Sequence, residues 1–134
     1  MTIPESSKIP SRKIRGYRDL IVWQKGMDLV VETYRLGQAL PNEERYVLKD
    51  QMLRASISIP SNVAEGHGRM SKGEFLRYLG ISRGSLHELE TLIEVCQRVG
   101  YLDGSALSKA KLLADEEGAM LWTLMEKLGA RRWR

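Results

Sequence analysis

The chain has 134 residues and a mass of 15.3 kDa, which fits one domain and argues against a two-domain enzyme with a cleft between its domains. Hydrophobic residues make up 43% and charged residues 28% of the chain, which is enough apolar material for a core and excludes wholesale disorder. Aromatic residues are only 7%. Because the apolar set is rich in Leu, Ile, Val, Ala and Met, the composition predicts an all-α fold.

The net charge of +4 is concentrated at the two ends of the chain. Residues 1–18 carry +4 and residues 126–134 carry +3, whereas the body between them carries −3. Basic tails can neutralise phosphates and release counterions, which predicts binding to RNA or DNA. Basic termini also serve solubility alone, so both interpretations stay open. The candidate nucleic-acid-binding residues are Lys8, Arg12, Lys13, Arg15, Arg18, Arg131, Arg132 and Arg134.

The cellular compartment is predicted from the cysteine content and from the apolar runs. The single cysteine, Cys96, cannot form an internal disulfide, which fits a reducing compartment. Residues 1–18 lack the apolar run of a signal peptide, and no stretch is apolar over the length of a membrane span. We therefore expect a cytoplasmic protein without a membrane segment.

The first structured element is predicted to follow a flexible basic leader. Residues 1–16 contain two prolines and a glycine and show no apolar periodicity, which is typical of a leader. A helix is then predicted from Asp19, whose side chain can cap it, to Leu40, which precedes a proline. Its apolar positions at helical spacing are Leu20, Trp23, Met27, Val30, Val31 and Tyr34.

The second helix is predicted to start at Asn42, because this residue and the acidic residues after it suit a helix N-terminus. Its apolar seam comprises Leu48, Met52, Ala55, Ile59 and Val63. Pro60 lies inside this pattern, so the helix either bends or splits there, since proline removes a backbone donor and clashes with the preceding turn. Gly66 and Gly68 mark its end.

The third and fourth helices have clear start signals. Ser71 and Glu74 form a capping-box pattern, and Gly100 ends the third helix. Its buried stripe comprises Phe75, Leu79, Leu86, Leu89, Ile93 and Cys96. The fourth helix begins at residues 103–105, and its stripe comprises Leu107, Ala110, Leu113, Leu121, Leu124 and Leu128. Four helices with short connections predict an up-down-up-down four-helix bundle over residues 17–128, with a basic tail over 129–134.

Five glycines lie inside the predicted helices, where each costs about 1 kcal/mol relative to alanine. They are Gly26, Gly37, Gly80, Gly84 and Gly118. We expect a neighbouring helix or subunit to approach the backbone closely at some of these positions.

No motif in the sequence predicts catalysis. Ser85 and His87 are two positions apart on a predicted helix, so their side chains point in different directions. Glu65 and His67 could ligate a metal, but no third ligand follows at a suitable spacing, and a small hydrolase that uses this pair is the weakest hypothesis. We therefore predict that the protein is not an enzyme and has no catalytic residues, metal or cofactor.

A polar segment interrupts the apolar second helix, with the sequence Arg54-Ala-Ser-Ile-Ser-Ile-Pro-Ser-Asn-Val-Ala-Glu-Gly66, followed by Arg69. Buried Ser and Asn side chains need hydrogen-bond partners, so this segment is expected to fix packing around Pro60. The segment resembles the signature of the four-helix-bundle proteins encoded by intervening sequences in bacterial 23S ribosomal RNA genes.

Other segments support the same resemblance, which spans residues 17–125. The first helix of that family is matched by Leu20, Trp23 and Met27, and the end of that helix is matched by Tyr34 and Pro41. The signature of its third helix is matched by residues 84–91. Family members are similar to the accessory variability determinant of diversity-generating retroelements, a homopentameric barrel whose basic surface engages reverse transcriptase and nucleic acid.

The resemblance implies a four-helix bundle that assembles into a homopentameric ring, with no enzymatic activity and no cofactor. The slightly acidic body of this chain differs from that basic surface, so the tails would have to supply the charge. The matched residues are interpreted as structural or interface positions, not as an active site. They are Arg54, Ser58, Pro60, Asn62, Glu65, Gly66 and Arg69.

The sequence thus leads to two hypotheses of different classes. The first is a non-enzymatic oligomeric protein that binds RNA or DNA through its basic tails and is accessory to a nucleic-acid-processing partner. The second is a protein-interaction scaffold in which the ring presents helix faces to a protein partner and the tails only aid solubility. Exposed apolar residues such as Trp122 and Trp133 could bury further surface between subunits.

Overall fold

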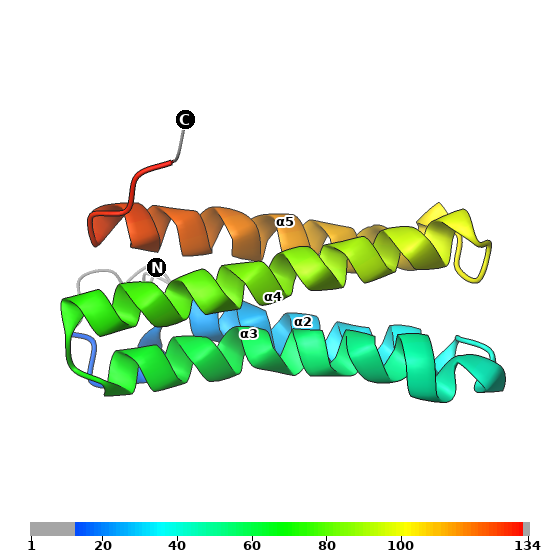
Figure 1. Cartoon of the computed structure of the whole chain (residues 1–134), viewed down its shortest axis with the longest axis horizontal. Helices are drawn as coiled ribbons and strands as arrows, with labels where there is room; N and C mark the ends of the chain where they lie inside the picture. Colours follow the sequence, from blue (N-terminus) through cyan, green and yellow to red (C-terminus); the bar gives the residue numbers. More distant parts are fainter. Residues whose placement is uncertain (1–12, 133–134) are drawn as a thin grey trace, which may run out of the picture.

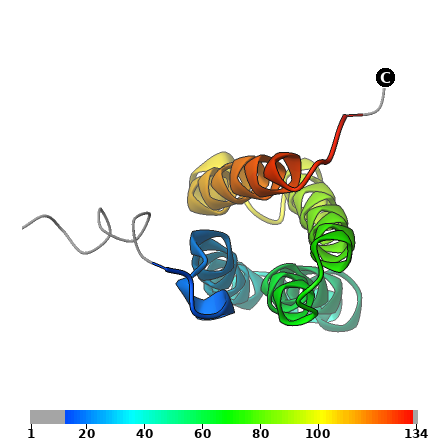
Figure 2. The ribbon, with the colours of Figure 1, turned by 90° about the vertical axis from the view of Figure 1, so that its left-hand side faces the viewer.

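The structure is a computed structural model that describes residues 13–132, and this part of the chain forms helices and no strands. Four long helices run side by side with alternating direction (Figure 1). They are α2 (Ile21–Gln38), α3 (Asp50–Gly68), α4 (Lys72–Arg98) and α5 (Gly104–Lys127). Each packs against the next, and α5 closes the bundle against α2 (Figure 2). The predicted up-down-up-down bundle is confirmed.

The chain enters the bundle through a short 3₁₀ turn, η2 (Tyr17–Asp19), before α2 starts. The predicted capping role of Asp19 is wrong, because α2 follows Leu20 and has no side-chain cap. The carboxylate of Asp19 instead accepts a hydrogen bond of 2.9 Å from the backbone N–H of Arg15. Asp19 thus stabilises the turn that precedes the helix.

The helix α2 carries two apolar stripes, and three of the apolar positions that the sequence shows at helical spacing lie on the outer one. Met27, Val31 and Tyr34 are exposed. The core side of α2 instead comprises Val22, Gly26, Leu29, Val30, Thr33, Leu36 and Gly37. Both stripes have helical spacing, so periodicity alone does not decide which faces inward.

The connection to α3 contains a 3₁₀ turn, η3 (Asn42–Glu44), and a π-helical turn, η4 (Arg45–Lys49), where the sequence predicts one continuous helix. All five residues of the predicted seam of α3 are buried. The helix continues through Pro60, so it does not split there.

The start signals of the last two helices are confirmed. The Ser71 hydroxyl accepts a hydrogen bond from the backbone N–H of Glu74, and the Asp103 carboxylate accepts one from that of Ala106. Gly100 adopts a positive φ of 85° after α4, a conformation that glycine adopts without steric cost.

The expected close approach at interior glycines holds for some positions only. A Cβ atom added at Gly37 would lie 3.3 Å from the side chain of Lys49, whereas at Gly80 and Gly84 it would meet no atom within 4 Å. The tightest of the predicted positions is Gly26, where the added Cβ would lie 2.9 Å from Oε2 of Glu117 and 3.3 Å from Cβ of Pro60. Gly26 of α2 therefore makes room for a side chain of α5 and a ring of α3.

Glu117 is an acidic residue in the middle of the core. It is 0% exposed, and neither carboxyl oxygen has a hydrogen-bond partner among the described residues. Burial raises its pKa to about 8, with a smaller opposing effect of Lys25 and a further increase from Asp28. A raised pKa means that this carboxyl is mostly neutral at pH 7, which reduces the cost of burying it.

We predict that Glu117→Gln removes a pH dependence of stability. The folded state binds the Glu117 proton more tightly than the unfolded state does, so this stabilisation is complete below the unfolded pKa and is lost as pH rises through about 8. Between these pKa values the wild type should lose about 1.4 kcal/mol of unfolding free energy per pH unit relative to the variant. Urea unfolding from pH 4 to pH 9 measures this difference.

The matched control is Glu126→Gln, which changes an exposed carboxylate on the same helix. This control should follow the pH profile of the wild type. A constant difference between the wild type and Glu117→Gln across the pH range would contradict the prediction.

Candidate nucleic-acid interface

The alternating direction of the helices brings three separate segments to one end of the bundle, on the left of Figure 1. They are residues 13–20 before and at the start of α2, residues 65–78 around the α3–α4 turn, and residues 124–132 at the end of α5. We call these segments together the basic end. They contain four acidic residues and nine basic ones, namely Lys13, Arg15, Arg18, Arg69, Lys72, Arg77, Lys127, Arg131 and Arg132.

The opposite end of the bundle has the reverse charge balance. It is formed by residues 38–50 and 94–106, which contain five acidic and three basic residues. The charge of the described residues is therefore distributed unevenly along the length of the bundle, which the net charge of −3 on the body of the chain does not show. Such an asymmetry directs a polyanion to one end.

Ion pairs neutralise only part of the basic end. Arg15 pairs with Asp19 at 3.8 Å, Arg69 with Glu65 at 3.5 Å and Arg77 with Glu74 at 3.1 Å. The Arg77 hydrogen bond lowers the pKa of Glu74. Within residues 13–132, no carboxylate forms an ion pair with the other six basic side chains, which are Lys13, Arg18, Lys72, Lys127, Arg131 and Arg132. These cations are available for phosphate groups.

Aromatic rings lie among the cations of the basic end. Tyr17 and Trp23 meet edge to face with their ring centroids 5.2 Å apart, and the guanidinium of Arg18 lies 5.4 Å and 5.5 Å from the two centroids. Arg69 donates a hydrogen bond of 2.7 Å to the hydroxyl of Tyr78. Guanidinium groups next to aromatic rings suit combined contact with phosphates and bases.

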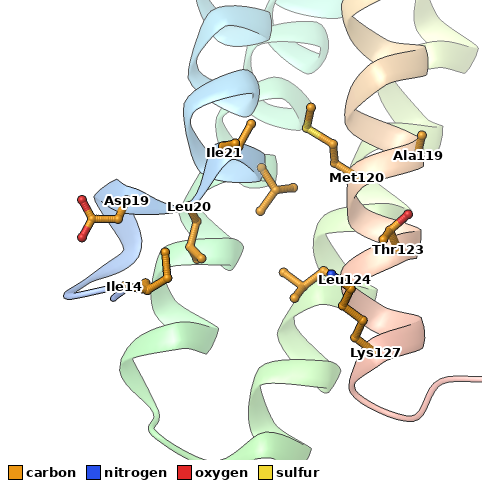
Figure 3. A pocket seen from close by; sticks show the side chains of 10 residues that line it. Ile14, Asp19, Leu20, Ile21, Ala119, Met120, Thr123, Leu124 and Lys127 are labelled. Carbon is orange, nitrogen blue, oxygen red and sulfur yellow. The ribbon is translucent and has the colours of Figure 1, made fainter. Parts of the chain in front are cut away.

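A groove lies between the residues that lead into α2 and the C-terminal part of α5 (Figure 3). Its volume is about 470 Å³, and its walls are mainly apolar side chains from the start of the described chain and from α5, with Asp19 and Lys127 as the charged groups. Ile14 and Leu20 face Met120 and Leu124 across it. This composition fits an apolar group better than a phosphate.

The polar segment of α3, residues 54–66, mostly makes contacts inside the bundle. The Ser58 hydroxyl lies 2.8 Å from that of Ser85 on α4, and the Asn62 amide donates to Ser58. Pro60 is buried against α2. Arg54 instead pairs with Asp50 on its own helix with an exposed side chain. Most of this segment therefore joins helices and does not form a binding surface.

Gly66 is a point of close contact between α3 and α4. A Cβ atom added there would lie 2.5 Å from Cβ of Tyr78, which is closer than side chains can pack. Glu65 and Arg69 on either side of it pair with each other. This glycine allows Tyr78 to pack where it receives the hydrogen bond of Arg69.

We predict that Gly66→Ala destabilises the bundle by about 2 kcal/mol or more, because overpacking costs typically 1–3 kcal/mol and the neighbouring atom belongs to a rigid part of Tyr78. The matched control is Gly84→Ala, which lies in a helix with open space around it. That variant should gain up to about 1 kcal/mol from helix propensity. Urea unfolding of both proteins measures the effects, and an equal response of the two variants would contradict this role of Gly66.

Three of the predicted nucleic-acid-binding residues, Lys8, Arg12 and Arg134, lie outside the described residues, as does Trp133. The described tail residue Arg132 lies over the ring of Trp122, with its guanidinium carbon 4.3 Å from the centroid. Arg83 of α4 lies 5.5 Å from the same ring. The sequence alone does not predict this arrangement, because Arg83 is distant in the chain from both other residues.

The residues of the weak hydrolase hypothesis do not come together as a site. Glu65 pairs with Arg69, and the ring of His67 packs edge to face against Phe75 at 5.5 Å. Among residues 13–132, no three His, Cys, Asp or Glu side chains are grouped as metal ligands. In the same part of the chain, no helix has the length and apolar character needed to span a membrane.

Comparison with known proteins defines the class to which this antiparallel bundle belongs. A family model described as 23S rRNA-intervening sequence protein matches residues 18–123. The chain belongs to this family. No curated protein matches it.

A solved structure shows the same fold. It is a protein of unknown function from the S23 ribosomal protein family of Bacteroides thetaiotaomicron, with a TM-score of 0.73 and 24% sequence identity. The match covers 78% of this chain and 98% of that chain. It therefore supports the bundle described above.

Proposed function

We propose that this chain is a non-enzymatic RNA-binding protein whose basic end contacts the phosphate backbone. One observation carries the proposal: three segments that are far apart in sequence place nine Lys and Arg residues at one end of the bundle. The proposed contacts include Lys13, Arg15 and Arg18 before α2 and Arg131 and Arg132 after α5. The α3–α4 turn adds Arg69, Lys72 and Arg77, which the sequence analysis did not assign together.

The physics of polyanion binding favours such an arrangement. Each cation that replaces a condensed counterion contributes to affinity through counterion release, and clustered cations act on neighbouring phosphates of one strand. The aromatic groups next to Arg18 add a surface on which unpaired bases can stack. The family description, which refers to 23S rRNA, supports RNA over DNA as the ligand. We further propose that the protein works in the cytoplasm and is accessory to an RNA-processing partner.

We predict that the triple variant Lys13→Glu, Arg15→Glu, Arg18→Glu binds single-stranded RNA at least 10-fold more weakly than the wild type. Three lost phosphate contacts should also reduce the slope of log affinity against log salt by about 2. Fluorescence anisotropy with a labelled mixed-sequence RNA, measured from 50 to 300 mM salt, gives both quantities.

The matched control is the triple variant Arg45→Glu, Arg98→Glu, Lys109→Glu. It changes the net charge equally, but Arg45 and Arg98 lie at the opposite end of the bundle and Lys109 lies on α5 next to that end. Its salt slope should stay close to that of the wild type. Equal losses in the two triple variants would show that only net charge matters and would overturn the assignment to the basic end.

The exposed stripe of α2 favours the second candidate function, a scaffold built by self-association. Met27, Val31 and Tyr34 are 39%, 67% and 47% exposed, and Ile57 of α3 beside them is 41% exposed. Met27 and Ile57 border a mainly apolar hollow of about 340 Å³ between α2 and α3. An apolar face of this kind is typical of a protein interface. We propose that it joins copies of the chain into a homo-oligomer, with five subunits as the number implied by the family resemblance.

We predict that the purified, nuclease-treated protein has a light-scattering mass near five subunits and that Val31→Glu reduces this mass. A carboxylate in the centre of an apolar interface would have to be desolvated, which opposes association. Val99→Glu, an exposed change outside the stripe, is the control and should leave the mass unchanged. A monomeric wild type at micromolar concentration would overturn the oligomer proposal, whereas the RNA-binding proposal stands on its own measurement.

A further inference from the structure

A polar cleft lies between α4 and α5, next to the apolar groove of Figure 3, with which it shares Ala119 and Thr123. Its volume is about 390 Å³, which is large enough for a nucleobase with its sugar. Trp122, Arg83 and Arg132 form one part of its wall, and Glu90 and Asp115 form another. The lining also includes the small residues Gly118 and Ala119, which lie between Asp115 and Trp122 in the sequence of α5.

The cationic part of the cleft is built around an indole ring. The guanidinium carbons of Arg132 and Arg83 lie 4.3 Å and 5.5 Å from the centroid of Trp122. Arg132 follows the end of α5 and is exposed, and no carboxylate of the described residues pairs with Arg83 or Arg132. Two unpaired guanidinium groups next to a flat ring suit a ligand with an anionic group and a π face.

The acidic part of the cleft restricts the class of ligand further. Glu90 on α4 is half-buried and Asp115 on α5 is exposed. Burial raises the pKa of Glu90, and the charge of Asp115 raises it further, while His87 and Arg83 lower it. The two carboxyl groups line the same cleft. A phosphate alone would be repelled from this wall, so the ligand needs hydrogen-bond donors at the end distant from its anionic group.

Among the four RNA bases, guanine fits this wall best. Its Watson–Crick edge presents N1–H and an N2 amino group side by side, so one carboxylate can accept two hydrogen bonds from it. Adenine and cytosine present one amino group beside an acceptor nitrogen, and uracil presents one N–H between two carbonyls. A carboxylate therefore favours guanine.

We propose that this cleft binds a single unpaired guanine nucleotide of an RNA strand. The base stacks on Trp122 in place of the Arg132 side chain, its Watson–Crick edge donates to Glu90 or Asp115, and Arg83 and Arg132 pair with the adjacent phosphates. This inference rests on the proposed RNA-binding function and adds a base preference to it. It also gives Arg132 a role distinct from the general charge of the basic end.

The test compares two RNA oligomers of eleven nucleotides, each a uridine tract with one central substitution, either guanosine or adenosine. Anisotropy titrations on the full chain should show about 10-fold tighter binding of the guanosine oligomer, since a bidentate base contact contributes about 1–3 kcal/mol of discrimination. The double variant Glu90→Gln, Asp115→Asn should reduce this ratio to near 1. The ratio is informative because a change in net charge affects both oligomers equally.

The matched control is the double variant Glu88→Gln, Glu126→Gln, which neutralises two exposed carboxylates of the same helices outside the cleft. It should keep the guanosine preference. Equal affinities of the wild type for the two oligomers, or a preference that survives in Glu90→Gln, Asp115→Asn, would overturn the guanine site while leaving RNA binding by the basic end intact. Failure of the wild type to bind either oligomer would overturn both proposals.

Discussion

The close approach of three helices at Gly26, Pro60 and Glu117 is the constraint on which the centre of the bundle depends. A Cβ atom at Gly26 would lie 2.9 Å from Oε2 of Glu117 and 3.3 Å from Cβ of Pro60, so any residue larger than glycine would force the Glu117 carboxyl and the Pro60 ring to shift. The buried carboxyl is compatible with this packing because its raised pKa keeps it mostly neutral. Pro60 also has no N–H to satisfy. The bundle thus tolerates polar and irregular residues in its core.

The connectivity of this bundle in turn determines where charge collects. With short turns and alternating helix directions, the start of α2, the α3–α4 turn and the end of α5 must share one end of the molecule. The basic end therefore forms because the topology brings together three segments of the sequence that are rich in cations, namely the two termini and one turn. The net charge of the whole chain, or of its body, does not show this uneven distribution.

The sequence predicted the helices and three of the four core seams, because strong caps such as Ser71 and Asp103 and a single apolar stripe leave little ambiguity. For α2 it did not decide which face points inward, since Met27, Val31 and Tyr34 repeat with the same period as the core residues. The candidate site was predicted only in part. The sequence predicted the cations of the two tails as separate groups. The contact of Arg83 with Trp122 could not be predicted, because it depends on α4 and α5 being neighbours in the bundle.

The polar residues of α3 that carry the family resemblance mostly make contacts between helices, so they indicate the fold and do not indicate a binding surface. The hydroxyl of Ser58 forms a hydrogen bond with that of Ser85, and Tyr78 packs directly against Gly66, so these residues join α3 to α4. The family model covers residues 18–123, and Lys13, Arg15, Arg131 and Arg132 lie beyond it. Proteins that share the bundle are therefore free to differ in the charge of their termini without altering the core. Because the family model does not include these four cations, RNA binding through them has to be measured for this chain and does not follow from its family membership.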